Sequence, residues 1–288
     1  MTTTFASIAK LRATLKPLRQ DSTIALVPTM GNLHDGHIEL VRLAKTRADI
    51  VVVSIFVNPT QFGVGEDLDS YPRTLEADTK RLTEIGADYI FAPNVDQMYP
   101  VMPPPTQVLS GSISQQLCGL SRPTHFDGVG LVVSKLFNIV QPDIAIFGQK
   151  DYQQLAIIRQ LVRDLSYDIE IVAAPIVRAE DGLALSSRNQ YLTDSERQIA
   201  PTLHQEVLRL AQKLEQGEHM SSGLQALIDE AIARINSAGF KVDYLEVKRQ
   251  DLTDILDVQQ DQALVIVTAA WLGKARLLDN QVVRVLAI

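Results

Sequence analysis

An apolar run, a glycine-rich loop and an amphipathic helical pattern follow one another near the start of the chain. Residues 24–27 (Ile-Ala-Leu-Val) predict a buried strand, and apolar side chains recur at helical spacing over residues 38–44. Such a unit places a helix N-terminus, with its unpaired N–H groups, at the carboxyl end of a sheet strand, where phosphate binds readily. Gly31 and Gly36 would let a ligand approach the loop backbone closely. This pattern predicts an α/β fold with a candidate phosphate-binding loop.

Strand and helix patterns then alternate along the first part of the chain, which predicts a doubly wound parallel sheet. Loops follow the strands at Thr29, Asn58 and Gly148, at the edge where such sheets bind ligands. A proline-rich stretch over residues 99–105 predicts an extended connector, with a lid as the alternative. The expected strands are residues 50–57, 89–92, 144–147 and 170–173, and the expected helices are residues 75–85, 129–140 and 152–164. The N-terminal stretch is expected to form an amphipathic helix through Ile8, Leu11, Leu15 and Leu18.

The pattern changes in the last third of the chain, where a smaller α+β domain with an antiparallel sheet is expected. We place the boundary so that residues 1–176 form the first domain and residues 177–288 the second. Asp194 and Ser222 are candidate N-caps of the two expected helices. Those helices span residues 194–214 and 221–235, and the expected strands span residues 244–247, 264–269, 275–278 and 282–286.

Composition narrows the class of protein. The 288 residues are 46% hydrophobic and 21% charged, as in an ordinary globular protein. The net charge of −7 disfavours a nucleic-acid partner. The single cysteine, Cys118, excludes an intramolecular disulfide and agrees with a reducing compartment. Because no apolar run reaches membrane-spanning length, we expect a soluble, cytoplasmic protein with no membrane partner.

His34 and His37 stand three residues apart at the start of the first predicted helix after the glycine-rich loop. In the first helical turn they would project towards the same side and could donate hydrogen bonds to phosphoryl oxygens. A zinc pair is an alternative, but no third ligand is evident in the sequence. A purely structural role at the helix start is a second alternative. The surrounding strand–loop–helix context favours nucleotide phosphate.

Two further clusters carry cations near loop backbone. Lys150 stands at a helix start, where a cation is out of place without an anion, although a surface lysine is the alternative. Asp151 beside it is a candidate N-cap. The residues Ser186-Ser187-Arg188-Asn189 offer hydroxyls and a guanidinium that suit a phosphate, or form a simple polar turn.

Gln61 and Gln154 are neutral amides that could orient a small carboxylate without drawing electron density from it. That property matters if the carboxylate acts as a nucleophile. A single glutamine is most often a solvated side chain, so each residue alone is a weak indication.

Five longer segments occur in order along the chain: Pro-Thr-Met-Gly-Asn-Leu-His-Asp-Gly-His (residues 28–37), Phe-Val-Asn-Pro-Thr-Gln-Phe (56–62), Tyr-Pro-Arg-Thr (71–74), Phe-Gly-Gln-Lys-Asp-Tyr-Gln-Gln (147–154) and Leu-Ser-Ser-Arg-Asn (185–189). Taken together, these segments resemble the pantothenate synthetases, the pantoate–β-alanine ligases. The sequence departs from the family pattern at Gln149, where glutamate is usual, and at Leu185, where methionine is frequent.

The resemblance implies an ATP-dependent ligase of the nucleotidylyltransferase superfamily. It implies a Rossmann-like first domain, a second domain that acts as a lid, and a homodimer. His37 matches the position called proton donor, while Gln61 matches a contact to pantoate and β-alanine, Gln154 a second pantoate contact, and Tyr71 a position near β-alanine. The matching ATP-binding positions are Met30, Gly31, Asn32, Leu33, His34, Asp35, Gly36, His37, Gly148, Gln149, Lys150, Asp151, Val177, Leu185, Ser186, Ser187 and Arg188.

The implied reaction joins pantoate and β-alanine through a pantoyl adenylate, with release of pyrophosphate and AMP. His34, His37 and Lys150 would be the catalytic residues, and Mg²⁺ would enter with ATP rather than occupy a protein cage. Two other functions stay open at this point. One is a related nucleotidylyltransferase that transfers a nucleotide onto a phosphate, and the other is a nucleotide sensor without catalysis.

Overall fold

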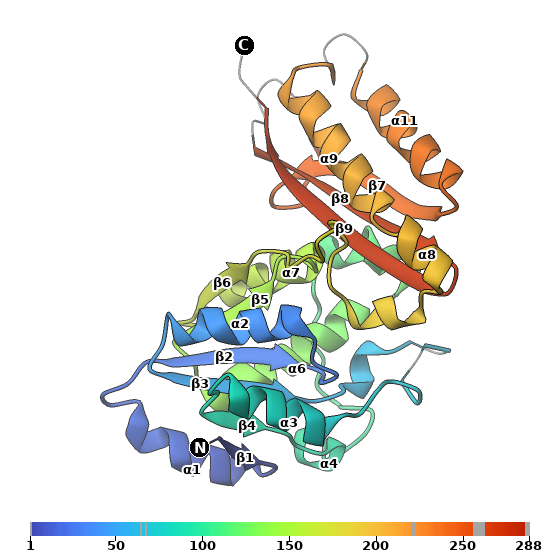
Figure 1. Ribbon diagram of the computed structural model, residues 1–288. Coiled ribbons are helices and arrows are strands. Elements are labelled where there is room, and N and C mark those ends of the chain that lie inside the picture. The colour runs from blue at the N-terminus through green and yellow to red at the C-terminus, as the bar shows by residue number, and fades with distance from the viewer. Residues whose placement is uncertain (1, 64, 67, 220–222, 256–262, 286–288) are drawn as a thin grey trace. The chain divides into compact units, whose positions relative to one another are not determined.

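The computed structural model describes residues 2–63, 65–66, 68–219, 223–255 and 263–285 (Figure 1). The chain forms two compact units. Unit 1 contains residues 1–149 and 153–175, and unit 2 contains residues 150–152 and 176–288. The three residues around Asp151 therefore belong to unit 2 although their neighbours on both sides belong to unit 1. The assignment of a nucleotide-binding and a lid role to the two parts stays a prediction.

Unit 1 is built on a six-stranded sheet in which all neighbouring strands of the described residues pair in parallel. This confirms the Rossmann-like α/β fold. The β-branched, buried residues of β3 explain its central place, because a parallel strand is covered on both faces. The strands in spatial order are β1 (Thr3–Phe5), β4 (Tyr89–Phe91), β3 (Ile50–Ile55), β2 (Ile24–Thr29), β5 (Ile144–Gly148) and β6 (Glu170–Ala174).

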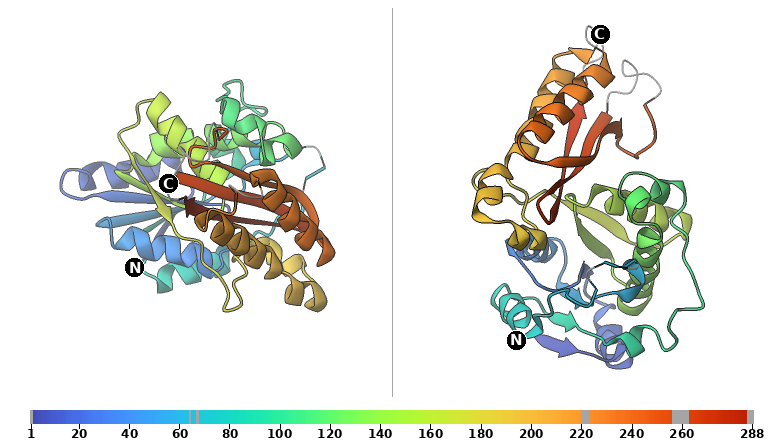
Figure 2. Two further views of the ribbon diagram at one scale, coloured as in Figure 1. Left: turned by 90° about the horizontal axis from the view of Figure 1, so that it is seen from above. Right: turned by 90° about the vertical axis from the view of Figure 1, so that its right-hand side faces the viewer.

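Helices cover both faces of this sheet, as two separate apolar clusters show (Figures 1 and 2). One cluster packs α2 (Asp35–Lys45) and α3 (Leu75–Glu84) on the sheet. The other packs α1 (Ile8–Leu18), α6 (His125–Val140) and α7 (Tyr152–Asp164) on the opposite face. Short helical segments lie in the connections: η1 (Pro59–Gln61), α4 (Val95–Met98), η2 (Ser112–Gln115) and α5 (Cys118–Ser121).

The strand order reverses between β2 and β5, which pair through Ala25–Ile144 and Leu26–Ala145. In open α/β sheets a ligand binds at the carboxyl ends of the strands at such a switch point. The loop after β2 begins at Met30, and β5 ends at Gly148. The topology thus brings two of the predicted nucleotide-binding segments to one edge of the sheet.

Unit 2 contains an antiparallel sheet of β7 (Lys241–Arg249), β8 (Ala263–Leu272) and β9 (Ala275–Arg284) in that order. The helices α9 (Thr202–Glu215) and α11 (Leu224–Ser237) pack on one face of it, where their apolar side chains form a single cluster with the strands (Figure 2). The segments η3 (Ser187–Tyr191) and α8 (Asp194–Ile199) precede α9. The predicted α+β class of this part is confirmed.

Several expected boundaries were wrong for local reasons. The single helix over residues 194–214 is two helices, because Pro201 has no N–H to donate and interrupts the helical hydrogen bonds. Thr193, rather than Asp194, is the N-cap of α8 and forms a capping box with Glu196. The expected strands at 275–278 and 282–286 belong to one strand, β9, since the polar residues between them continue the ladder to β8; β9 ends at Arg284, and residue 286 lies outside the described residues. Residues 221 and 222, with the expected cap Ser222, lie outside the described residues.

Other local differences are smaller. Helix α6 begins at His125, four residues before the expected start at Val129, and strand β1 escaped prediction because it is only three residues long. Residues 99–105 contain no helix or strand, as their prolines indicated. In the described part of the chain, every helix is too short or too polar to cross a bilayer.

Gly128 lets α6 approach the backbone of η1, the segment that carries Gln61. A Cβ atom at Gly128 would lie 2.2 Å from the carbonyl oxygen of Thr60. We expect Gly128→Ala to destabilise the protein by about 1–3 kcal/mol, because backbone must move to relieve the overlap. Urea unfolding followed by circular dichroism measures the loss.

Gly130→Ala in the same helix is the matched control. It gains the same helix propensity, yet its Cβ meets only side-chain atoms of Ser110 and Val108, each at 3.1 Å. Equal losses for the two variants would contradict the backbone explanation.

Candidate active site

The loop after β2 is shaped by one buried carboxylate. Asp78 on α3 is only 2% exposed and accepts hydrogen bonds from the backbone N–H groups of Asn32 (2.9 Å) and Leu33 (2.8 Å). Thr74 donates its hydroxyl to the same carboxylate at 3.0 Å. Arg81, one turn later, donates to the carbonyl oxygen of Leu33 at 2.8 Å. Helix α3 thus fixes both donors and an acceptor of the loop backbone.

Gly31 is required in this loop for two reasons. Its φ of +83° belongs to the left-handed region that side chains disfavour. A Cβ atom there would also lie 3.0 Å from Asp78 Oδ2 and 3.1 Å from Ile55 Cγ2. The absence of a side chain at Gly31, expected from the sequence to admit a ligand, therefore admits the protein's own Asp78 carboxylate.

His34 and His37 form the N-terminal cap of α2. His34 is the N-cap residue and its Nδ1 accepts from the Gly36 N–H at 3.1 Å, while His37 Nδ1 accepts from the His34 N–H at 3.3 Å. The ring centroids are 4.1 Å apart. Because each Nδ1 accepts a hydrogen bond from a backbone N–H, each neutral ring carries its proton on Nε2. The structural role that the sequence left open is real, and it orients two Nε2–H donors.

Gln61 is held at the end of β3 by a set of buried amides and hydroxyls. Asn58, 1% exposed, donates its Nδ2 to Gln61 Oε1 at 3.1 Å and accepts at Oδ1 from Tyr99 and Thr60. Burial raises the pKa of Tyr99, so its hydroxyl stays a donor. Gln61 Nε2 lies 3.1 Å from Met30 Sδ, which joins the substrate-binding candidate to the loop after β2.

The neighbours of Gln61 extend this arrangement. His125 Nδ1 lies 2.7 Å from the carbonyl oxygen of Gln61, and Arg122 lies 3.1 Å from the other ring nitrogen. Arg122 also donates to both carboxylate oxygens of Glu66 through Nε and Nη2, and those hydrogen bonds lower the pKa of Glu66. Tyr71 is 7% exposed and packs edge-on against Phe62. Gln154 lies in the first turn of α7.

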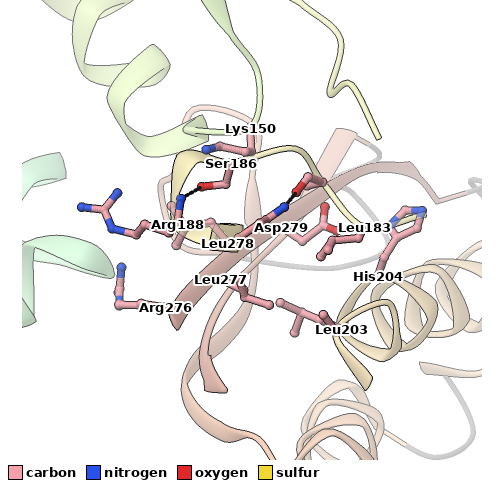
Figure 3. A pocket seen from close by; sticks show the side chains of 13 residues that line it. Lys150, Leu183, Ser186, Arg188, Leu203, His204, Arg276, Leu277, Leu278 and Asp279 are labelled. Carbon is pink, nitrogen blue, oxygen red and sulfur yellow. Dashed lines mark hydrogen bonds and ion pairs between the residues drawn. The ribbon is translucent and has the colours of Figure 1, made fainter. Parts of the chain in front are cut away.

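Unit 2 contains a polar pocket that includes three of the predicted nucleotide-binding residues, Lys150, Ser186 and Arg188 (Figure 3). Arg188 and Arg276 lie towards one end of the pocket and His204 towards the other. Lys150 forms an ion pair with Asp151 at 3.5 Å, in the turn before α7 rather than at its first residue. The pocket therefore combines cations with a hydroxyl, as anion binding requires.

The predicted residues Val177 and Leu185 lie on the two arms of a short hairpin, and Ser186, Ser187 and Arg188 follow it. Val177 accepts the Leu185 N–H at 2.9 Å, and Arg178 bridges Ala184. Ser186 caps η3 by accepting the Arg188 N–H at 3.2 Å. Val177 and Leu185 thus pair with each other through their backbones.

The residues that hold these segments were not among the predicted site residues: Asp78, Arg178, Asp279 and Asn280, together with Asn58, which was noted only as a loop and motif position. In the sequence, Asp78 is one of several charged residues of an amphipathic helix and is not distinguished from the others. Asp279 and Asn280 interrupt an apolar run. The partners through which Asp78, Asp279 and Asn280 hold these segments lie far away in the sequence, so no local pattern marks these three residues. Among the described residues, no group of three or more His, Cys, Asp or Glu side chains is placed to hold a metal ion.

Comparison with known proteins decides the family. The family model of pantoate-beta-alanine ligases matches residues 3–282. A pantothenate synthetase of Psychrobacter sp. (strain PRwf-1) is 72% identical over 282 residues, which cover 98% of this chain and 99% of that protein. The chain belongs to the pantoate–β-alanine ligase family. It is accordingly a ligase that forms the C–N bond between pantoate and β-alanine.

Solved structures agree with this assignment. A pantothenate synthetase from Thermus thermophilus matches with a TM-score of 0.88 at 43% identity and covers 97% of this chain and 98% of its own. A pantoate–β-alanine ligase from Francisella tularensis, described as complexed with beta-gamma ATP and β-alanine, matches with a TM-score of 0.80 at 35% identity. It covers 98% of this chain and 97% of its own.

Asp78→Asn tests the control of the loop by α3. The amide turns one acceptor into a donor that faces a backbone N–H, which costs about 1–3 kcal/mol at a buried site. We expect faster hydrogen exchange at the Asn32 and Leu33 amides, measured by NMR or mass spectrometry. Asp49→Asn is the matched control, because Asp49 also accepts from a backbone N–H and a hydroxyl, both of Thr23. Faster exchange of the two loop amides in the control as well would contradict the assignment.

Proposed function

We propose that this ligase activates pantoate with ATP as a pantoyl adenylate and then transfers the pantoyl group to β-alanine. A pantoate carboxylate oxygen attacks the α-phosphorus and pyrophosphate leaves. The amine of β-alanine then attacks the acyl carbon, and AMP leaves. The observation that carries this proposal is the pair of oriented imidazoles at the end of β2, at the switch point of a parallel sheet.

The nucleotide would lie along the loop after β2, from Met30 to His37. The Nε2–H groups of His34 and His37 would donate to phosphoryl oxygens on which negative charge grows during attack. In unit 2, Lys150, Ser186, Ser187 and Arg188 would bind phosphate oxygens in the same way. The remaining segments with an ATP-binding role in this proposal are Gly148 to Asp151, Val177 and Leu185.

Pantoate would be oriented by neutral amides. Gln61 Nε2 has two N–H groups, and one of them faces Met30 Sδ. The second would bind the substrate, with Gln154 as a further contact and Tyr71 beside the β-alanine amine. Since an amide carries no net charge, the carboxylate keeps its nucleophilicity.

Mg²⁺ would enter bound to the triphosphate, because this ion is commonly held by substrate phosphates and water rather than by a cage of protein side chains. Closure of unit 2 as a lid, a homodimeric state and a cytoplasmic location belong to the same proposal. A lid would keep water from the mixed anhydride until the amine attacks.

The product test supplies ATP, Mg²⁺, β-alanine and pantoate labelled with ¹⁸O in its carboxylate. An adenylate intermediate transfers one labelled oxygen to AMP, because the C–O bond breaks in the second step. Mass spectrometry of AMP measures the label. Formation of ADP and labelled phosphate would instead indicate an acyl-phosphate intermediate and would contradict the adenylate. Intact ATP with every acid offered would favour the nucleotide sensor, and pyrophosphate without AMP the transfer onto phosphate.

The role of His37 can be separated from its capping role by two substitutions. In His37→Asn the amide oxygen can replace Nδ1 as the cap, but the Nε2–H donor is lost. In His37→Gln the amide nitrogen can reach the Nε2 position, but the cap is weakened. Loss of a preorganised donor costs about 10²–10³-fold, so we expect His37→Asn to slow single-turnover adenylate formation by that factor.

His37→Gln is the comparison variant and should retain the larger share of the rate. If His37→Asn is instead nearly as fast as the parent enzyme, His37 acts only as a helix cap.

A further inference from the structure

Two buried polar residues interrupt the apolar strand β9, and both reach segments that carry candidate phosphate ligands. Asp279 and Asn280 are 4% and 1% exposed. Because successive side chains of a strand point to opposite faces, the two residues serve different neighbours. All residues concerned belong to unit 2.

Asp279 binds Arg178 with two parallel hydrogen bonds, both 2.7 Å long. Arg178 Nη1 also donates to the carbonyl oxygen of Gly182 at 3.1 Å. The guanidinium therefore ties β9 to the turn of the hairpin that leads into Ser186. On the other side, His204 Nδ1 lies 3.2 Å from Asp279 Oδ2, and a Cβ at Gly182 would come within 2.9 Å of the His204 ring. The turn is thus enclosed by the ion pair and the imidazole.

Asn280 has the corresponding role for Lys150. Its Nδ2 donates to the carbonyl oxygen of Lys150 at 3.0 Å. Neighbouring residues of one strand therefore fix the backbone of Lys150 and the turn before Ser186 and Arg188, and these three residues line the same pocket.

The electrostatics of the pocket favour this arrangement. Burial alone would raise the pKa of Asp279, but hydrogen bonds and charge from Arg178 and His204 outweigh it and hold that pKa low. The carboxylate that lines the pocket is therefore ionised and already paired, so it repels a phosphate less than a bare carboxylate would. A buried ion pair adds little stability over apolar side chains of similar size, so stability alone does not account for it.

We propose that Arg178, Asp279 and Asn280 are positioning residues that hold Lys150 and the loop of Ser186 and Arg188 in register for a nucleotide triphosphate. The inference rests on the proposed function, since it takes those residues as phosphate ligands. The positioning residues themselves act through the groups that they hold.

Arg178→Lys tests the proposal. Lysine keeps the charge next to Asp279 but cannot make the parallel pair and the bond to Gly182 together. We expect the KM for ATP to rise about five- to tenfold, with the KM for pantoate changed less than twofold. Steady-state kinetics with each substrate varied in turn measures both, and thermal unfolding reports stability.

Arg234→Lys is the matched control. Arg234 on α11 also holds a buried carboxylate, Glu206, at 2.6 Å, but Glu206, unlike Asp279, does not line the pocket. The control should lose a similar amount of stability and keep its KM for ATP. An unchanged KM for ATP in Arg178→Lys, or an equal rise for ATP and pantoate, would overturn the proposal.

A second variant keeps the test decisive if Arg178→Lys does not fold. The double substitution Arg178→Met with Asp279→Leu replaces the pair by apolar side chains, which is often neutral for stability. It should show the same selective rise in the KM for ATP, and a KM equal to that of the parent enzyme would overturn the proposal.

The activity of the parent enzyme distinguishes a failure of the proposed function from a failure of the positioning role. If that enzyme does not consume ATP with pantoate and β-alanine, the proposed function fails; if it does and the variants match it, only the positioning role fails.

Discussion

The hydrogen bonds from the backbone N–H groups of Asn32 and Leu33 to the Asp78 carboxylate decide the shape of the loop after β2. A loop at a helix N-terminus has several N–H groups without backbone partners. Here the buried carboxylate takes two of them and the histidine caps take the next ones. The same caps set the direction of the imidazole Nε2–H groups, the donors that the proposed function assigns to phosphoryl oxygens. The chemistry proposed for this enzyme depends on that division.

Unit 2 uses the same physical device with a different donor. Asp279 is as deeply buried as Asp78, and it holds its loop through the guanidinium of Arg178 rather than through backbone N–H groups. In both units a carboxylate on a regular element fixes a glycine-containing turn, at Gly31 and at Gly182. A helix or strand is more rigid than a loop, so a loop tied to one keeps its functional groups within a narrow range of positions.

The sequence predicted the architecture well because its signals are local. The alternation of apolar strands with amphipathic helices gave the parallel sheet, and the segment around His34 placed the loop at the end of β2. Prediction failed where a residue's role depends on distant partners. The polar residues at 279 and 280 divided β9 into two expected strands, because their burial depends on Arg178 and Lys150, more than a hundred residues away. Pro201 is visible in the sequence, but the apolar periodicity on both sides of it predicted one continuous helix. In the structure the helix is interrupted there.

The same reasoning explains why the family motifs and the supporting residues differ in how they can be found. A residue proposed to contact a ligand, such as His34, stands among neighbours of a particular kind in the chain, here glycines, so its motif is contiguous. A residue that supports it needs only a buried position and one polar atom at the correct distance. Asp78 meets that need 46 positions from Asn32, and Asp279 meets it 101 positions from Arg178. Such residues become visible only when the fold is known, and a buried polar side chain with loop backbone or a loop-holding cation as its partner is the feature that reveals them.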